Sequence, residues 1–173
     1  MAVSGLGGMG KTQLSVRFAE RFHEVYSSVC WINAQDERTL RMGIVALGRR
    51  IAGENVSKSV GDNNDEEEIV QQVLQWFSRP DNDGWLMVMD NYDDPQLPGI
   101  KSLTGYDIRR FLPQRSHGSI LITTRCPRLT FATPLRLGKL EDLHQSLAIL
   151  THQSGRDAES GKSFATIGKG GDG

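Results

Sequence analysis

The sequence predicts an α/β protein in which a parallel sheet carries helices on both faces. Short apolar segments alternate along the chain with longer segments whose apolar residues recur at helical spacing. Two of the short segments, 85–89 and 119–123, are almost entirely apolar, as is typical of strands that are buried on both faces. The intervening segments are long enough for the crossovers that join parallel strands. A chain of 173 residues corresponds to one such domain.

The first half of the chain is expected to hold two strand–helix units. A short strand over 1–4 leads into a glycine-rich loop, and an amphipathic helix follows over 12–24. The segment 28–33 (SVCWIN) is β-branched and aromatic, which predicts a buried strand. Asp36 is a suitable N-cap for a second helix that ends at Gly53.

The second half continues the alternation. A helix is expected over 65–78, where the acidic residues of the first turn suit the helix dipole. After the two apolar strands come a fifth strand over 133–137 and a final helix over 141–154. The tail 155–173 has no periodicity and is expected to be disordered. Each tryptophan lies in an apolar segment and is expected in the core: Trp31, Trp76 and Trp85.

Composition narrows the classes of function. The net charge is −1, from 20 basic and 21 acidic residues, which argues against a strongly basic nucleic-acid binder. The longest strictly apolar run is five residues, too short to cross a membrane. The two cysteines, Cys30 and Cys126, form no disulfide framework, so we expect reduced thiols and a cytoplasmic location.

The segment 5–12 (GLGGMGKT) fits the phosphate-loop pattern G-x-x-x-x-G-K-[ST] in full. Its glycines let several backbone N–H groups point at phosphate oxygens, and the following helix N-terminus adds partial positive charge. Lys11 is expected to reach the β- and γ-phosphates, and the Thr12 hydroxyl to bind Mg²⁺. The predicted set of residues that bind ADP or ATP is Gly5, Gly7, Gly8, Met9, Gly10, Lys11, Thr12 and Gln13.

Two later strands are expected to bring polar side chains to the same edge of the sheet. The strand 85–89 leads into Asp90, where a carboxylate would hold Mg²⁺ together with Thr12. The strand 119–123 leads into Arg125, whose guanidinium could contact a γ-phosphate. Arg125 therefore joins the predicted nucleotide-binding residues.

Together these segments resemble the NB-ARC nucleotide-binding domain of the signal-transduction (STAND) branch of P-loop ATPases, in the form seen in fungal NLR-like proteins. The loop is similar to the family's G-x-G-G-x-G-K-T, and the whole likeness covers 1–154. The resemblance implies a P-loop NTPase three-layer fold with a mostly parallel sheet in the strand order 5-1-4-3-2. The further matching segments are 29–34 (second strand), 85–94 (Walker B strand), 118–125 (sensor strand) and 137–150 (fifth strand and helix).

Two departures from the family pattern shape the expected activity. Many relatives place an acidic residue directly after the magnesium aspartate, where this chain has Asn91, a poor base. The catalytic candidates are then Asp90, Asp93 and Asp94, and the chain is expected to be at most a weak ATPase. The family's helical lid and winged helix have no counterpart after Ser154, and the first strand is short, so a truncated domain is expected.

The leading hypothesis is a Mg²⁺-dependent ADP/ATP switch module of a signalling protein, with slow or no hydrolysis. In such a family, nucleotide exchange permits self-association or contact with protein partners in a larger receptor. A small-molecule P-loop kinase is an alternative, for which Arg109 and Arg110 are the adjacent basic pair. A second alternative is a truncated remnant that binds a partner without enzymatic activity.

Overall fold

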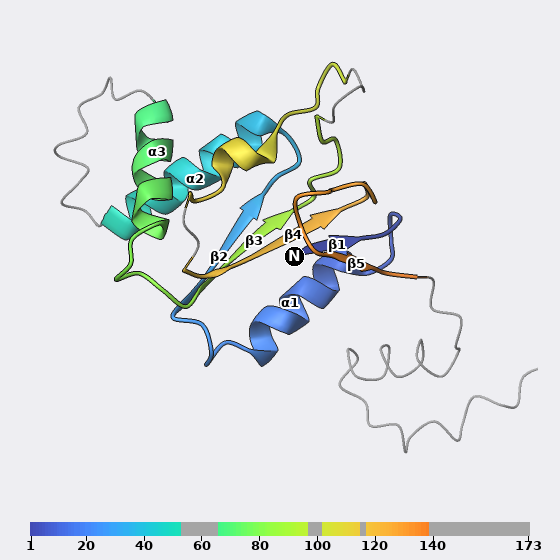
Figure 1. Cartoon of the computed structure of the whole chain (residues 1–173), viewed down its shortest axis with the longest axis horizontal. Helices are drawn as coiled ribbons and strands as arrows, with labels where there is room; N and C mark the ends of the chain where they lie inside the picture. Colours follow the sequence, from blue (N-terminus) through green and yellow to red (C-terminus); the bar gives the residue numbers. More distant parts are fainter. Residues whose placement is uncertain (53–65, 97–101, 115–116, 139–173) are drawn as a thin grey trace, which may run out of the picture. The chain divides into compact units, whose positions relative to one another are not determined.

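The computed structural model is an α/β structure built on a five-stranded, all-parallel sheet (Figure 1). It describes residues 1–52, 66–96, 102–114 and 117–138. The chain divides into two compact units, Met1–Leu137 and Gly138–Gly173, and every element below belongs to the first. The elements are β1 (Ala2–Ser4), α1 (Lys11–Arg21), β2 (Ser28–Asn33), α2 (Glu37–Ala52), α3 (Glu66–Phe77), β3 (Trp85–Asp90), the short 3-10 helix η1 (Ile108–Phe111), β4 (Ser119–Thr124) and β5 (Pro134–Arg136).

The strand order is β2-β3-β4-β1-β5, which confirms the order expected from the resemblance. β4 lies between β1 and β3, with Ser4 level with Thr124 and Met89 level with Ile122. The carboxyl ends of the three central strands therefore meet at one edge of the sheet. The polar residues that follow these strands in the sequence are gathered at that edge, where parallel sheets bind ligands.

Element boundaries differ little from those expected. α1 begins at Lys11 but ends at Arg21, before the predicted end at residue 24, where the N–H of Phe22 donates to the Phe18 carbonyl. The 3-10 helix η1 was not predicted, because four residues are too few to show a helical period. The predicted helix 141–154 and the tail 155–173 lie outside the described residues.

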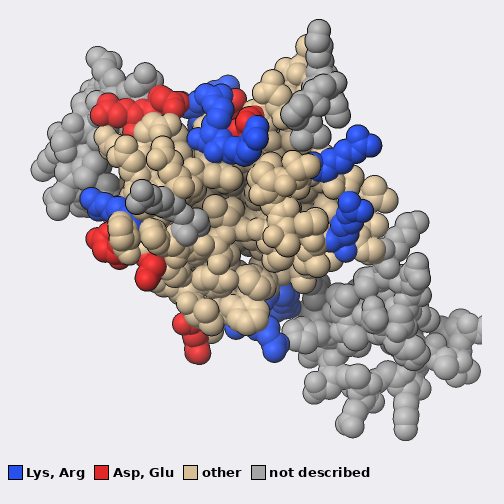
Figure 2. Space-filling view, in the orientation of Figure 1, with Lys and Arg blue, Asp and Glu red and all other residues tan. Residues whose placement is uncertain are grey.

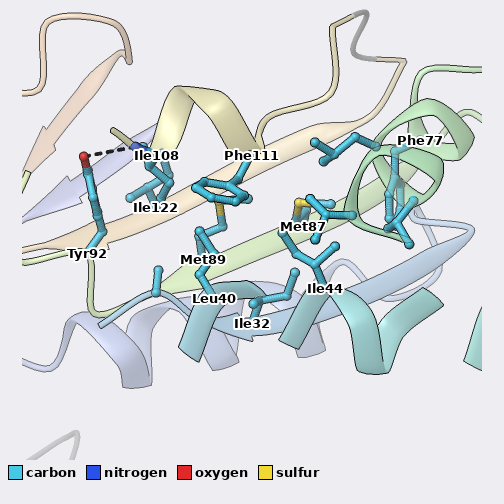
Figure 3. Packing of buried hydrophobic residues seen from close by; sticks show 14 of the residues in the cluster. Ile32, Leu40, Ile44, Phe77, Met87, Met89, Tyr92, Ile108, Phe111 and Ile122 are labelled. Atoms are coloured by element: carbon cyan, nitrogen blue, oxygen red, sulfur yellow. Dashed lines mark hydrogen bonds between the residues drawn. The ribbon is translucent and has the colours of Figure 1, made fainter. Parts of the chain in front are cut away.

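The sheet separates two layers of helix (Figure 1). α2, α3 and η1 cover one face and build the larger core around β3, in which Trp85, Met87 and Met89 are buried (Figure 3). α1 covers the other face, where Leu86 and Val88 of the same strand are buried. Alternate residues of β3 point to opposite faces, so its continuous apolar run is explained by cover on both sides.

The prediction that β2 is a buried strand with a core tryptophan is wrong. β2 is an edge strand whose residues alternate in burial, and Trp31 is 41% exposed, whereas Ile32 is buried beneath α2. Trp85 has no exposed surface and Trp76 is partly buried. An aromatic strand sequence does not reveal which strand lies at the edge, because that depends on the order of strands in the sheet.

α2 is fixed at its start by a side-chain cap and along its length by close contacts. The Asp36 carboxylate accepts hydrogen bonds from the Thr39 backbone N–H (2.8 Å) and hydroxyl (2.7 Å), so its predicted capping role is confirmed. A side chain at Gly43 would lie 2.7 Å from Ile32 Cγ2, and one at Gly48 would lie 2.7 Å from Val73 Cγ2. These two glycines let α2 approach both β2 and α3 closely.

The surface mixes the two signs of charge. Figure 2 shows basic and acidic side chains side by side on the face in view. Arg41 of α2 pairs with Glu37 at 3.2 Å and with Glu67 of α3, which ties the two helices together. Among the described residues, no helix combines the length and apolar character needed to span a bilayer.

Candidate nucleotide site

The glycine-rich loop connects the buried end of β1 to the first turn of α1. Gly8 and Gly10 have φ angles of 77° and 78°, in the left-handed region that favours glycine. Gly10 is the N-cap of α1, and no side chain caps the helix there. A helix N-terminus that no side chain caps is the kind of site at which other proteins bind a phosphate.

Lys11 reaches back across the loop. Its Nζ donates hydrogen bonds to the carbonyl oxygens of Gly5 (2.9 Å) and Leu6 (3.0 Å). The N–H of Leu6 is directed at the Met9 sulfur, 3.2 Å away. The loop is therefore held in a curled conformation by its own residues, with the ammonium group hydrogen-bonded to its first two carbonyl groups.

Asp90, at the end of β3, lies against the start of α1. The Thr12 hydroxyl is 3.1 Å and 3.2 Å from the two carboxylate oxygens of Asp90. Thr123, at the end of β4, donates a hydrogen bond to the same carboxylate. Asp90 is only 5% exposed and Thr123 has no exposed surface, whereas Thr12 is exposed, so the cluster opens to solvent on the side of α1.

The turn after β3 is fastened to β4. Asn91 has a φ angle of 69°, and its N–H donates to the Thr123 hydroxyl at 2.9 Å. The N–H of Tyr92 donates to the Thr123 carbonyl at 2.9 Å, and the Thr124 hydroxyl donates to the Tyr92 carbonyl. The direction of the chain beyond Asp90 is thus set by hydrogen bonds with the backbone and the hydroxyl groups of the neighbouring strand.

The next two carboxylates have separate partners. Asp93 accepts a hydrogen bond from the Arg125 backbone N–H (2.7 Å) and lies 2.9 Å from Arg125 Nε. Asp94 accepts hydrogen bonds from the hydroxyls of Ser102 (2.9 Å) and Thr104 (2.5 Å). Both candidate bases are therefore engaged with other side chains.

Arg125 lies over the glycine-rich loop. A β-carbon placed on Gly7 would be 3.7 Å from Arg125 Cζ, so the guanidinium fills the space next to the loop that a side chain at this position would enter. The side chain is 65% exposed and extends from the end of β4, between β1 and β3. In the strand order, Arg125 therefore stands between the glycine-rich loop after β1 and Asp90 at the end of β3.

A pair of tyrosines supports the edge of the site. The Tyr92 hydroxyl donates to the Tyr106 carbonyl (2.7 Å) and accepts from the Ile108 N–H (3.3 Å; Figure 3). The Tyr106 hydroxyl donates to the Ala34 carbonyl at 2.6 Å. Burial raises the pKa of both tyrosines, so they are neutral donors. They bind η1 to the carboxyl ends of β2 and β3.

The remaining predicted residues have peripheral positions. Gln13 lies in the first turn of α1 and is exposed. Arg109 pairs with Asp107 at 2.7 Å, and Arg110 lies 3.6 Å from Glu37. These two arginines are held on η1 by ion pairs with neighbouring acidic groups.

Two features of the site were missed. Thr123 was not singled out as a partner of Asp90, although two hydroxyl residues at the end of an apolar strand were a usable signal. The pairing of Asp93 with Arg125 joins residues 32 positions apart and leaves no local pattern in the sequence. Only the parallel alignment of β3 and β4 brings them together.

Comparison with known proteins gives one informative match. No protein-family model matches the chain. A Nucleotide-binding leucine-rich repeat (NLR)-like protein from Hyaloscypha variabilis (strain UAMH 11265 / GT02V1 / F) is 29% identical over 133 residues. The alignment covers 72% of this chain and 13% of the relative, so the chain spans a small part of that protein. The chain is thus similar to one segment of an NLR-like protein.

Proposed function

We propose that this chain is a P-loop nucleotide-binding segment that binds ADP or ATP with Mg²⁺ and acts as a switch in an NLR-like signalling protein. The observation that carries the proposal is the convergence of Lys11, the uncapped N-terminus of α1 and Arg125 on one glycine-rich loop. Two side-chain cations and a helix N-terminus directed at the same loop favour a polyanionic ligand. The printed name of the similar protein supports a nucleotide as that ligand.

The residues beside the loop fit a magnesium ion. Mg²⁺ prefers hard oxygen ligands and keeps several of its waters, so one or two protein oxygens are sufficient. The Thr12 hydroxyl and the Asp90 carboxylate supply them side by side, and Thr123 orients the carboxylate. A bound Mg²⁺ would neutralise phosphate charge; the chain's own part is to fix these oxygens next to the loop.

The same geometry favours slow hydrolysis. A general base must come within hydrogen-bond reach of the attacking water, and Asn91 carries no basic group. Asp93 and Asp94, the other candidates, are engaged by Arg125 and by Ser102 and Thr104. A slow step suits a switch, because the bound nucleotide then persists long enough to set the state of the protein.

No described feature favours the kinase alternative. Such an enzyme needs mobile cations that close over the transferred phosphate. On η1, Arg109 is instead paired with Asp107, the N-cap residue, and Arg110 with Glu37 of α2. The cytoplasmic location and the protein partners expected for a signalling switch are part of the proposal. The two free cysteines, Cys30 and Cys126, suit a reducing compartment.

The test is calorimetric titration of MgADP into the wild-type chain and into Lys11→Ala. A hydrogen bond to a charged group contributes about 1.5–3 kcal/mol, so affinity should fall roughly tenfold or more. Arg17→Ala is the matched control, because it removes an exposed basic side chain that pairs with Glu20 on α1. Equal affinity in wild type and Lys11→Ala, with both folded by circular dichroism, would overturn the assignment of the loop.

A further inference from the structure

The Asp93–Arg125 pair has a defined geometry. One carboxylate oxygen of Asp93 accepts from the Arg125 backbone N–H at 2.7 Å, and the other lies 2.9 Å from Nε of the same residue. Asp93 therefore fixes both the backbone and the near edge of the guanidinium. An arginine side chain has many rotamers, and Arg125 is 65% exposed, so without Asp93 it would adopt many orientations.

The two Nη nitrogens of Arg125, on the side of the guanidinium away from Asp93, remain available as hydrogen-bond donors. Among the described residues, neither Nη nitrogen of Arg125 donates a hydrogen bond to the protein. A β-carbon on Gly7 would lie 3.9 Å from Nη1, so this nitrogen is next to the loop that is proposed to hold phosphates. A guanidinium held by its Nε edge presents two parallel N–H groups from its other side, which suits bidentate binding of an oxyanion.

Asp93 itself is placed by contacts that do not involve its carboxylate. The turn before it is fastened to β4 through the N–H groups of Asn91 and Tyr92 and through the Thr124 hydroxyl. Removal of the Asp93 carboxylate therefore leaves the turn anchored. Its effect should be confined to the freedom of Arg125.

We propose that Asp93 is a positioning residue that holds Arg125 ready for the γ-phosphate and thereby sets the preference of the site for ATP over ADP. Asp93 can have this role only if the chain binds nucleotides as proposed above. This role differs from that of a catalytic base, because Asp93 changes the affinity for nucleotide and does so through Arg125. It also differs from a restraining role, in which Asp93 would compete with the γ-phosphate for the guanidinium.

The experiment measures the affinities of MgADP and of a non-cleavable MgATP analogue for wild type, Asp93→Ala, Arg125→Ala and the double variant. Asp93→Ala should lower the affinity for the ATP analogue, relative to that for ADP, roughly tenfold, because a charged contact to the third phosphate is lost. The affinity for ADP should be nearly unchanged. The double variant should be no worse than Arg125→Ala alone, since both changes remove one interaction.

Asp107→Ala is the matched control. Asp107 likewise accepts a hydrogen bond from the backbone N–H of an arginine, Arg109, and forms an ion pair with its guanidinium, but it lies at the start of η1. Its removal should leave the ratio unchanged. Circular dichroism and thermal unfolding of each variant establish that the chain remains folded.

The other outcomes overturn the positioning role. An unchanged ratio in Asp93→Ala, with or without slower turnover of ATP, would make Asp93 a base or a structural ion pair. A raised ratio would make it a competitor of the γ-phosphate. If the ratio is unchanged or raised but ADP still binds normally, the positioning role is overturned and the proposed function is not. If the wild-type chain binds no nucleotide, the proposed function and the positioning role are both overturned.

Discussion

The two faces of the sheet differ in how much apolar surface they bury. On the face of α2, α3 and η1, nineteen buried residues of the described chain form one cluster. On the face of α1, four buried residues form a second cluster, and the residues packed against them, such as Phe18 and Ala19, are only partly buried. Leu14 of α1 and Phe22, directly after this helix, are exposed, although their helical spacing suggested a core-facing stripe. We therefore expect the larger cluster to contribute more to stability than the smaller one, which packs against the helix that follows the glycine-rich loop.

The largest loss of stability is expected in the larger cluster. Phe77 of α3 has no exposed surface and packs edge-on against Trp85, with ring centroids 4.9 Å apart. Phe77→Ala should lower the free energy of unfolding by about 3–5 kcal/mol, because a large cavity is left among rigid neighbours. Urea unfolding measures the change. If Phe77→Ala lowered the free energy of unfolding by less than Leu86→Ala on the other face, the larger cluster would not be the more important one for stability.

A smaller loss is expected on the α1 face of the same sheet. Leu86 of β3 is 1% exposed, but its neighbours Phe18 and Tyr26 are partly open to solvent and can move inward. Leu86→Ala should cost about 2–3 kcal/mol, at the low end for a buried leucine. Leu86→Met keeps the volume and should cost less than about 1.5 kcal/mol. The same unfolding assay compares all three variants.

The smallest change in stability is expected from the binding of MgADP next to α1. At an MgADP concentration ten times its dissociation constant, binding should stabilise the chain by about 1.4 kcal/mol. Hydrogen exchange should show increased protection in the loop and α1, while local openings of α3 change little. The alternative result is an equal increase in protection in α1 and α3 at amides that exchange by local opening and not by global unfolding. It would show that the helices on the two faces open together.

Much of the fold followed from the sequence because its elements have strong local signals. The glycine-rich loop, the apolar run 85–89 and the Asp36 cap each depend on a few adjacent residues, and the structure has a loop, a buried strand and a helix cap at these positions. The exposure of Trp31 was not predictable in this way, since it follows from the edge position of β2. The partners of Asp90 and Asp93 likewise depend on the register between β3 and β4, which no short segment of sequence encodes.

The two close-contact glycines of α2 have a consequence for the order in which the protein assembles. Glycine lowers helix propensity by about 1 kcal/mol relative to alanine, so Gly43 and Gly48 weaken a 16-residue helix that would be marginal alone. The same residues allow the contacts with Ile32 and Val73 that compensate for this weakness. α2 should therefore form only when β2 and α3 are already beside it. The three elements then make up a single cooperative folding unit, in which α2 cannot exist as an early independent helix.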